Sequence, residues 1–219
     1  MSLLKNTIIL GAGSYGEVFL TYLLEQGFNV IGFYDDDPSR LGKKIHGVKV
    51  LGNFKDLFTV ECKQNIHKIF CPIGNNIIRE KYLKELFDFG YETPNLIHKS
   101  VILNKDVTIG NGVYLLPGVI IMPYTKISDY VIISVGSNIS HHTVIKKGVF
   151  ISTGVNVGAN ITINSKAFLG ISSTIMTGVT TVGTESTIGC GAVVIKDVED
   201  YHIMAGVPAK TLRIKTPYN

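Results

Sequence analysis

Two adjacent histidines, His141 and His142, are the side chains of this sequence best placed for proton transfer. They lie between Ile139 and Ile145, which belong to a regular series of inward-pointing aliphatic residues described below. The histidines themselves fall at positions that do not point into the core. A side chain there faces solvent or a neighbouring subunit, as a general base must. The sequence therefore predicts His141 as a general base, the alternative being an exposed histidine without a role.

A glycine-rich segment near the N-terminus is the second candidate for chemistry. Gly11-Ala12-Gly13-Ser14-Tyr15-Gly16 follows an apolar run and precedes an amphipathic segment, and Asp35-Asp36-Asp37 follows the next apolar run. Such glycines let the backbone approach a phosphate at a helix N-terminus, and the acid can accept a ribose hydroxyl. We expect a nucleotide across the strand ends near Gly13, Asp35 and Gly74. The alternative is that the three acids only solvate a turn.

The elements that position these residues can be outlined from the apolar pattern. We expect strands at 7–10, 29–34 and 67–73, and helices from the glycine segment to about residue 26 and from 77 to 89. They form a small parallel α/β domain. A dinucleotide fold needs two such halves, and the space before residue 95 holds little more than one. The domain is therefore predicted to bind a mononucleotide, which argues against a dehydrogenase.

A six-residue period dominates the rest of the chain and decides its fold. Branched aliphatic residues recur every sixth position without a break, and after one extra residue the series resumes: Ile97, Leu103, Ile109, Leu115, Ile121, Ile127, Ile133, Ile139, Ile145, Ile151, Val157, Ile163, Leu169, Ile175, then Val182, Ile188 and Val194. Helices repeat every 3.6 residues and strands every two, so neither fits. Short strands joined by tight corners fit, with three sides closing a coil of 18 residues.

The corners of these coils have their own pattern. A second column of small or β-branched residues follows each aliphatic by four positions, as at Val113 and Val131. Glycines are expected where the corners need a positive φ: Gly110, Gly112, Gly118, Gly136, Gly148, Gly154, Gly158 and Gly178. Stacked coils bring residues 18 apart into one column, which places Ala159 and Thr177 beside His141. Small side chains there leave an open groove along the corner, unless they are simply what corners tolerate.

Composition excludes several function classes. The formal net charge is +4, and the Lys and Arg residues are scattered, so no basic face for nucleic acid or a membrane surface is indicated. The three cysteines show no metal-ligand spacing and are expected to be reduced thiols. The N-terminal apolar run is read as a first strand and not a signal peptide, and no stretch is long enough to span a membrane. We therefore expect a cytoplasmic protein.

At these motifs the chain resembles the sialic-acid O-acetyltransferase and bacillosamine N-acetyltransferase family of hexapeptide-repeat acyltransferases. The resemblance covers nearly the whole chain. Its motifs are Gly11-x-Gly13-x-x-Gly16, Asp35-Asp36, Gly74-Asn75-Asn76 with Ile78-Arg79, Asn95-Leu96-Ile97-His98 and Gly206-Val207-Pro208-Ala209-Lys210. The resemblance implies a Rossmann-like domain over 1–95 that holds a nucleotide-linked amino sugar, followed by a left-handed parallel β-helix over 96–219. A homotrimer with the active site between adjacent β-helices is implied as well.

The same resemblance implies particular roles. Acetyl-CoA would be the acyl donor, and the favoured acceptor is the 4-amino group of a nucleotide-linked 4-amino-4,6-dideoxy sugar. Gly13, Ser14, Tyr15, Asp35, Asp36 and Gly74 would line the nucleotide-sugar site. With this donor, the groove that coil stacking predicts along Ala159 and Thr177 suits a pantetheine arm. Phe150, Ala159, Ile171, Thr177 and Lys210 are predicted to line the coenzyme A site, where Lys210 meets the phosphates or is merely solvated. No metal is expected. The nucleotide and the sugar stereochemistry stay open.

Two positions depart from the family pattern. His142 stands where the family commonly places an acid that orients the base. Phe150 stands where some relatives carry a second histidine that meets the acetyl carbonyl. Because Phe cannot donate a hydrogen bond, the oxyanion donor would have to be a backbone N–H near Gly158 or Ala159.

Three other functions compete with N-acetyl transfer. A sugar O-acetyltransferase of the same fold differs only in its acceptor. A non-catalytic nucleotide-sugar binder would have no use for coenzyme A. A hexapeptide-repeat carbonic anhydrase needs three zinc ligands, whereas the repeats supply only the adjacent His141 and His142.

Overall fold

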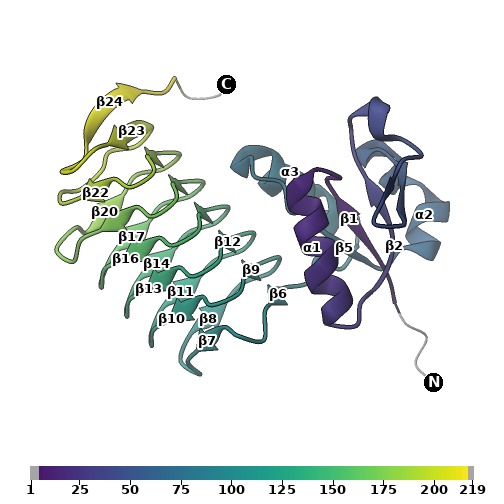
Figure 1. The fold of residues 1–219 in the computed structure, drawn as a ribbon, viewed down its shortest axis with the longest axis horizontal. Coiled ribbons are helices and arrows are strands. Elements are labelled where there is room, and N and C mark those ends of the chain that lie inside the picture. Colours follow the sequence, from purple (N-terminus) through teal and green to yellow (C-terminus); the bar gives the residue numbers. More distant parts are fainter. Residues whose placement is uncertain (1–4, 217–219) are drawn as a thin grey trace. The chain divides into compact units, whose positions relative to one another are not determined.

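The computed structural model describes residues 5–216, and the chain divides into two compact units with the boundary between Pro94 and Asn95 (Figure 1). The sequence places this boundary one residue later, at the point where the six-residue period begins. Each unit has a core of its own.

The N-terminal unit is built on a five-stranded sheet in the order β3-β4-β2-β1-β5. All pairs are parallel except β3 with β4. The strands are β1 (Asn6–Leu10), β2 (Asn29–Tyr34), β3 (Lys44–Ile45), β4 (Val48–Gly52) and β5 (Lys68–Phe70). The helices are α1 (Ser14–Glu25), α2 (Val60–Asn65) and α3 (Asn76–Asp88), with 3-10 turns η1 (Pro38–Arg40) and η2 (Phe54–Phe58).

The predicted strands and helices of this unit are present, with one shortened and several short ones missed. The third strand ends at Phe70 and not at Ile73, because Pro72 has no amide proton to offer the sheet. The β3–β4 hairpin was not expected. It turns at His46 and Gly47, which both have positive φ, 47° and 85°. The 3-10 turns η1 and η2 and the helix α2 were not expected.

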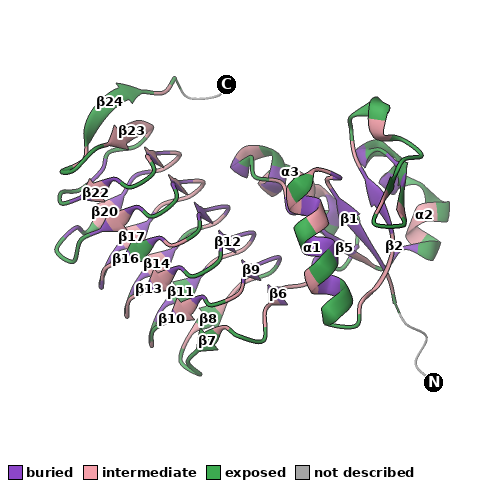
Figure 2. Ribbon diagram, viewed as in Figure 1, coloured by how far each residue is buried: buried purple, intermediate pink, exposed green. Residues whose placement is uncertain are grey.

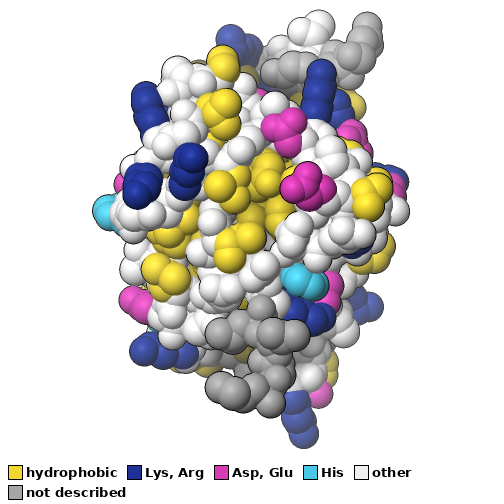
Figure 3. All heavy atoms as spheres, turned by 90° about the vertical axis from the view of Figure 1, so that its right-hand side faces the viewer, with side chains coloured by type: hydrophobic (Ala, Val, Ile, Leu, Met, Phe, Trp, Pro, Cys, Tyr) yellow, Lys and Arg dark blue, Asp and Glu magenta, His cyan; other side chains and the backbone are white. Residues whose placement is uncertain are grey.

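The central strands of this unit carry completely buried apolar side chains. Ile8, Ile9, Phe33 and Phe70 are each 0% exposed, and Figure 2 colours most of β1 as buried. Other apolar side chains stay on the surface, among them Leu41, Val60 and Phe87. Figure 3 shows apolar side chains gathered at the centre of one face of the molecule, with acidic and basic side chains around them.

The second unit is a β-helix whose coils contribute one two-residue strand to each of three sheets, and these sheets are parallel except for the final β23–β24 pair. The first sheet holds β7 (Ile102–Leu103), β10 (Ile120–Ile121), β13 (Asn138–Ile139), β16 (Asn156–Val157), β19 (Thr174–Ile175) and β22 (Val193–Val194). The second holds β8 (Thr108–Ile109), β11 (Lys126–Ile127), β14 (Val144–Ile145), β17 (Thr162–Ile163) and β20 (Thr181–Val182). The third holds β6 (Leu96–Ile97), β9 (Tyr114–Leu115), β12 (Ile132–Ile133), β15 (Phe150–Ile151), β18 (Phe168–Leu169), β21 (Thr187–Ile188), β23 (His202–Ala205) and β24 (Lys210–Ile214).

The strand register confirms the six-residue period. Ile121 pairs with Ile139, 18 positions on, and after the extra residue Ile163 pairs with Val182, 19 positions on. From Leu115 onward every member of the predicted inward series is buried in one continuous core. In the first coil Leu103 is 36% exposed, contrary to the expectation of an inward position, because no earlier coil covers it.

The corners of the coils correct part of the glycine prediction. Gly112, Gly118, Gly136, Gly148, Gly154 and Gly178 have positive φ as expected, but Gly110 and Gly158 do not. These two are needed for space. A Cβ on Gly110 would lie 2.4 Å from Asp129 Oδ1, and one on Gly158 would lie 2.5 Å from the amide nitrogen of Thr177. Positive φ at non-glycine corners, including Tyr124 and His142, was not predicted.

The chain ends in a feature without a six-residue repeat. Strands β23 and β24 form an antiparallel hairpin at the edge of the third sheet. The turn between them packs on the last coil through the hydrogen bond from Ala209 N to Val193 O (2.7 Å). Across residues 5–216, no helix has both the length and the apolar character needed to cross a membrane.

The coil core predicts a large difference between two otherwise identical substitutions. Ile163→Ala empties a completely buried position and should lower the free energy of unfolding by about 2–5 kcal/mol. Ile102→Ala, at a 58% exposed position, should cost roughly 0.5 kcal/mol or less. Urea denaturation at matched protein concentration measures both. Equal losses would contradict the stacked core.

Candidate active site

The three glycines of the N-terminal loop serve three different purposes. Gly11 has a φ of +108° directly after β1, which only glycine adopts without strain. Gly16 lets the helix start against the loop, since a Cβ there would lie 2.1 Å from Gly11 O. Gly13 has an ordinary φ of −83°, and a Cβ added to it would meet nothing within 4 Å. Folding does not require Gly13 to be glycine, so the open space in front of it is available to a ligand.

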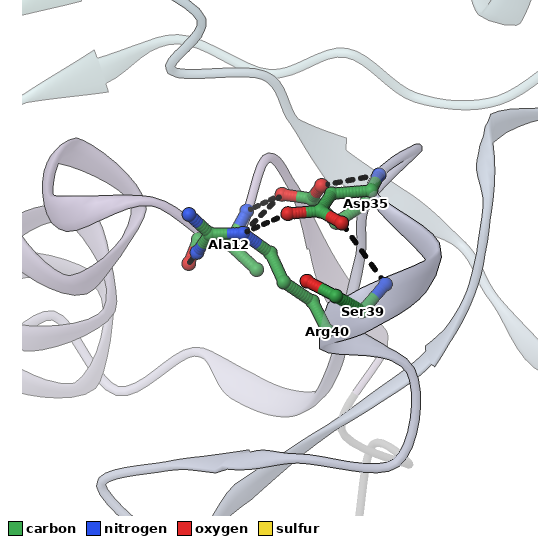
Figure 4. A network of polar contacts seen from close by, with 5 residues as sticks. Ala12, Asp35, Ser39 and Arg40 are labelled. Atoms are coloured by element: carbon green, nitrogen blue, oxygen red, sulfur yellow. Dashed lines mark hydrogen bonds and ion pairs between the residues drawn. The ribbon is translucent and has the colours of Figure 1, made fainter.

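Asp35 has a structural task that the sequence did not predict. Its carboxylate accepts hydrogen bonds from Ala12 N (2.7 Å) and Asp37 N (2.8 Å), and Arg40 Nε lies 4.0 Å away (Figure 4). Arg40 also donates to Ala12 O. These contacts join the glycine loop to the segment after β2. Each carboxylate oxygen can accept a second hydrogen bond, so this task leaves room for a ribose hydroxyl.

Asp36 is held in a comparable way on the other side of the same segment. It accepts hydrogen bonds from Phe54 N (2.9 Å) and from Tyr82 Oη. The rings of Phe54 and Tyr82 stack 3.7 Å apart with 9° between their planes. Burial, and then the contact with Asp36, raise the pKa of Tyr82, so its hydroxyl keeps its proton and remains the donor.

A cavity of about 780 Å³ opens beside these side chains. Its walls combine apolar and aromatic groups with acids and two lysines: Asp35, Asp36, Pro38, Leu41, Gly52, Asn53, Phe54, Lys55, Asp56, Phe58, Lys81, Tyr82 and Glu85. This volume suits a nucleotide-sized ligand. Of the six residues predicted for the nucleotide sugar, Asp35 and Asp36 line the cavity, while Gly13, Ser14, Tyr15 and Gly74 do not.

A second, smaller cavity lies against the glycine loop. It has a volume of about 320 Å³, and Ala12 lines it together with Arg40, Lys43 and Lys44. Two acids, Glu17 and Asp37, line it as well. Three cations near a loop of backbone N–H groups suit a phosphate. The sequence gives no sign of this cluster, because β3 and its neighbours were not predicted.

Gly74 occupies an open position at the end of the third strand, like Gly13 at the first. A Cβ on Gly74 would meet nothing within 4 Å. Asn75 caps α3 by accepting from Ile77 N (3.0 Å) and Ile78 N (3.1 Å). The completely buried Arg79 donates to Ile73 O (2.8 Å), which fixes the loop from within. Arg79 is therefore a residue of the fold, and the freedom at Gly74 is again what a ligand would use.

In the β-helix, His141 and His142 form the corner between β13 and β14. The chain at this corner is held by hydrogen bonds to both neighbouring coils, from His142 N to Pro123 O (3.2 Å) and from Asn160 N to His141 O (3.1 Å). His141 is half-buried and His142 is exposed. Their Nδ1 atoms lie 3.0 Å apart, within hydrogen-bond distance. A paired, partly exposed imidazole on a rigid corner is able to accept a proton from a substrate.

Ala159 and Thr177 lie at the same corner in the next two coils. Ala159 N donates a long hydrogen bond of 3.4 Å to Thr177 Oγ1, which a stronger acceptor could replace. The tight approach of Thr177 to Gly158 fixes the position of this backbone. Ala159 and Thr177 thus share the corner column of His141, one and two coils further on, as the spacing of 18 residues predicts.

The remaining predicted coenzyme A residues lie elsewhere on the same β-helix. Phe150 belongs to the third sheet, where its ring stacks on Phe168 with centroids 5.4 Å apart. Ile171 is 53% exposed at the corner between β18 and β19, and Lys210 begins β24. None of these three shares the corner of His141 within one chain.

No metal centre is evident in the described part of the chain. Between residues 5 and 216, no three His, Cys, Asp or Glu side chains are grouped so that they could hold a metal ion.

Comparisons with known proteins agree with this two-part organisation. Residues 6–86 match the family model described as PglD N-terminal domain. The structure of PerB from Caulobacter crescentus in complex with CoA and GDP-perosamine is 29% identical, with a TM-score of 0.87 over 95% of this chain and 98% of that one. The acetyltransferase domain of PglB from Neisseria gonorrhoeae FA1090, in complex with acetyl coenzyme A, is 25% identical, with a TM-score of 0.86 over 95% and 100%.

A more limited match concerns the redox-sensing transcriptional repressor Rex of Thermosipho africanus (strain TCF52B). It is 40% identical over 68 residues, which are 29% of this chain and 31% of the repressor. The matched segment spans less than a third of that relative, so it does not indicate the activity of this chain.

The fold and these matches define the class: a hexapeptide-repeat acyltransferase in which a left-handed β-helix follows a Rossmann-like domain along the chain. The resemblance to the sialic-acid O-acetyltransferase and bacillosamine N-acetyltransferase family is confirmed by these matches, the first of which covers residues 6–86.

The glycine loop yields a prediction about stability. Gly16→Ala should destabilise the protein by about 2–3 kcal/mol, because the new methyl group collides with Gly11 O. Gly13→Ala should change stability by less than about 1 kcal/mol. Thermal unfolding of the two variants makes the comparison. A strongly destabilised Gly13→Ala would mean that this glycine serves the fold and not a ligand.

Proposed function

We propose that this protein transfers the acetyl group of acetyl-CoA to the 4-amino group of a nucleotide-linked 4-amino-4,6-dideoxy sugar, with His141 as general base. The observation that carries the proposal is the half-buried His141 on a rigid β-helix corner, in a chain that has the fold of sugar N-acetyltransferases over 95% of its length. PerB, with CoA and GDP-perosamine bound, supports both the donor and the class of acceptor.

The reaction needs one proton acceptor and one oxyanion donor. The neutral amine attacks the thioester carbonyl carbon while Nε2 of His141 takes a proton from the amine nitrogen. The new C–N bond forms, the C–S bond breaks, and the proton on His141 passes to the departing thiolate of coenzyme A. The negative charge on the carbonyl oxygen in between is stabilised by a backbone N–H, for which Ala159 is the candidate beside His141.

The N-terminal unit would hold the nucleotide. The diphosphate is proposed to face Gly13 and Gly74, where folding leaves space open, and to draw on the cations of the smaller cavity. The larger cavity beside Asp35 and Asp36 would take the nucleoside, with a ribose hydroxyl donating to a carboxylate and the base against the apolar wall. Ser14 and Tyr15, at the start of α1, would line the phosphate side.

Coenzyme A is proposed to run along the corner column of Ala159 and Thr177, whose small side chains leave space next to His141. Phe150, Ile171 and Lys210 lie on other faces of the same chain. They would reach this coenzyme A only from a neighbouring subunit, which agrees with the homotrimer that the family resemblance implies. A cytoplasmic location is expected, because both substrates are soluble phosphorylated metabolites.

The acetyl-transfer proposal predicts turnover that depends on His141. Acetyl-CoA is incubated with UDP-, dTDP- and GDP-linked 4-amino sugars, and release of free thiol is followed. His141→Ala should lower kcat on the active sugar by about 10²–10⁴-fold, the usual contribution of a general base. His67→Ala, at an exposed histidine before β5, should leave the rate unchanged.

The outcomes separate the competing functions. Silence across the panel with coenzyme A still bound would point to a hydroxyl acceptor, as in a sugar O-acetyltransferase. Silence without binding of coenzyme A would contradict the acyltransferase proposal and favour a nucleotide-sugar binder.

The nucleotide site predicts a loss of affinity at a position that folding does not need. Gly13→Ala should weaken binding of the active nucleotide sugar at least about tenfold, because the methyl group occupies the space of a phosphate oxygen. Isothermal titration calorimetry measures the affinity. The thermal unfolding of Gly13→Ala, expected to be nearly unchanged, separates this loss of affinity from a general effect of the substitution on folding. Unchanged affinity in Gly13→Ala would place the phosphates elsewhere.

A further inference from the structure

The contact between His141 and His142 restricts how many protons the pair can hold. Two Nδ1 atoms 3.0 Å apart form a hydrogen bond only if one carries a proton and the other does not. The ring planes are at 89°, with centroids 5.1 Å apart, so the two rings meet edge to face and do not stack. The geometry therefore allows two neutral arrangements, which differ in the ring that supplies the shared proton.

Only one of these arrangements makes His141 a base. If Nδ1 of His141 donates, the single N–H proton of neutral His141 sits on Nδ1, and Nε2 keeps a free lone pair. If Nδ1 of His142 donates instead, the proton of neutral His141 sits on Nε2, and no basic nitrogen is left facing outward. A general base at His141 thus requires an acceptor at Nδ1 of His142.

We propose that His142 is a positioning residue: its unprotonated Nδ1 accepts the Nδ1 proton of His141 and so leaves Nε2 of His141 free to take the proton of the acceptor. This inference rests on the proposed acetyl transfer and deepens it. It assigns to a neutral imidazole the task of selecting one tautomer of its neighbour.

The pair also accommodates the charge that forms during the reaction. When Nε2 of His141 takes a proton, its Nδ1–H becomes a charge-assisted donor to the neutral ring of His142, and the hydrogen bond strengthens. A second proton added to the neutral pair would make both rings imidazolium ions with N–H groups on both Nδ1 atoms. This breaks the hydrogen bond and sets two cations side by side. The pair is therefore suited to one extra proton.

The backbone of the corner and a neighbouring ring fix the position of the His142 side chain. Its φ of 57° is left-handed, a conformation that Asn, Asp and His tolerate better than most residues. Tyr124, one coil earlier at the same corner, packs its ring 4.8 Å from that of His142. The titratable side chains in ring contact with His142 are thus His141 and Tyr124.

The left-handed backbone makes a matched set of variants available. His142→Gly removes the acceptor and keeps the positive φ without strain. His142→Asn also tolerates this φ, and its Oδ1 branches from Cγ where Nδ1 of the imidazole does, so it replaces the acceptor with a neutral oxygen. His142→Asp replaces the acceptor with an anion of the same reach.

The experiment measures kcat, KM and the pH profile of each variant on the active sugar. His142→Gly should lower kcat by about ten- to a hundredfold with little change in KM, since the lost hydrogen bond is to a group that becomes charged. His142→Asn should restore most of kcat. His142→Asp should restore it as well and move the acid limb of the profile to higher pH, because a carboxylate stabilises the protonated base. His142→Gly with unchanged kcat and pH profile would overturn the inference.

A second measurement does not depend on activity. With ¹⁵N-labelled histidine, the nitrogen shifts of the folded protein at neutral pH report which ring nitrogen carries the proton. The wild type should show His141 protonated at Nδ1 and His142 at Nε2, and in His142→Gly the preference of His141 should weaken. A wild-type His141 protonated at Nε2 alone would overturn the inference even in an active enzyme. Failure of the whole sugar panel would refute acetyl transfer to these amino sugars and leave this tautomer test intact.

Discussion

Coil-to-coil hydrogen bonding is the constraint on which the catalytic half of this protein depends. Each two-residue strand bonds to the strand 18 or 19 positions away, so every coil must turn three corners in the same places. A short strand leaves each corner about four residues, and one of them commonly adopts a positive φ. One residue of each strand points to the axis and has to be apolar. Chemistry is therefore restricted to the outward positions and the corners.

The corner at His141 fixes the backbone position of two adjacent histidines. Its backbone is bonded to the coil on one side and that of His142 to the coil on the other, so the imidazoles start from a fixed position and little entropy is lost in aligning them. The left-handed conformation of His142 belongs to the corner and exists without any catalytic need. It nevertheless turns the second ring back towards the first and brings two nitrogens into hydrogen-bond distance. The fold thus supplies the geometry, and the two residue types supply the chemistry that we propose.

In the N-terminal unit, the residues that folding requires differ from the positions that folding leaves open to a ligand. Gly11 and Gly16 are needed for the backbone turn and for close packing, whereas Gly13 and Gly74 leave space that the fold does not use. Asp35 and Asp36 both serve the fold first, one by anchoring the glycine loop and the other by anchoring Phe54 and Tyr82. A carboxylate held by such contacts has a defined position, which makes it a better partner for a ribose hydroxyl than a freely rotating acid.

The six-residue period by itself determined the β-helix, because an inward aliphatic at every sixth position is required whatever the outward residues do. Apolar runs, glycines and acids likewise located the strands and helices around the glycine loop. Only the tertiary structure decided the β3–β4 hairpin, the partners of Asp36 and the Nδ1 contact of the two histidines. Short elements such as η2 gain their stability from distant contacts, and Tyr82 lies 46 residues from Asp36. For the histidines the reason is conformational: adjacency in sequence says nothing about two rings until the corner sets the backbone angle between them.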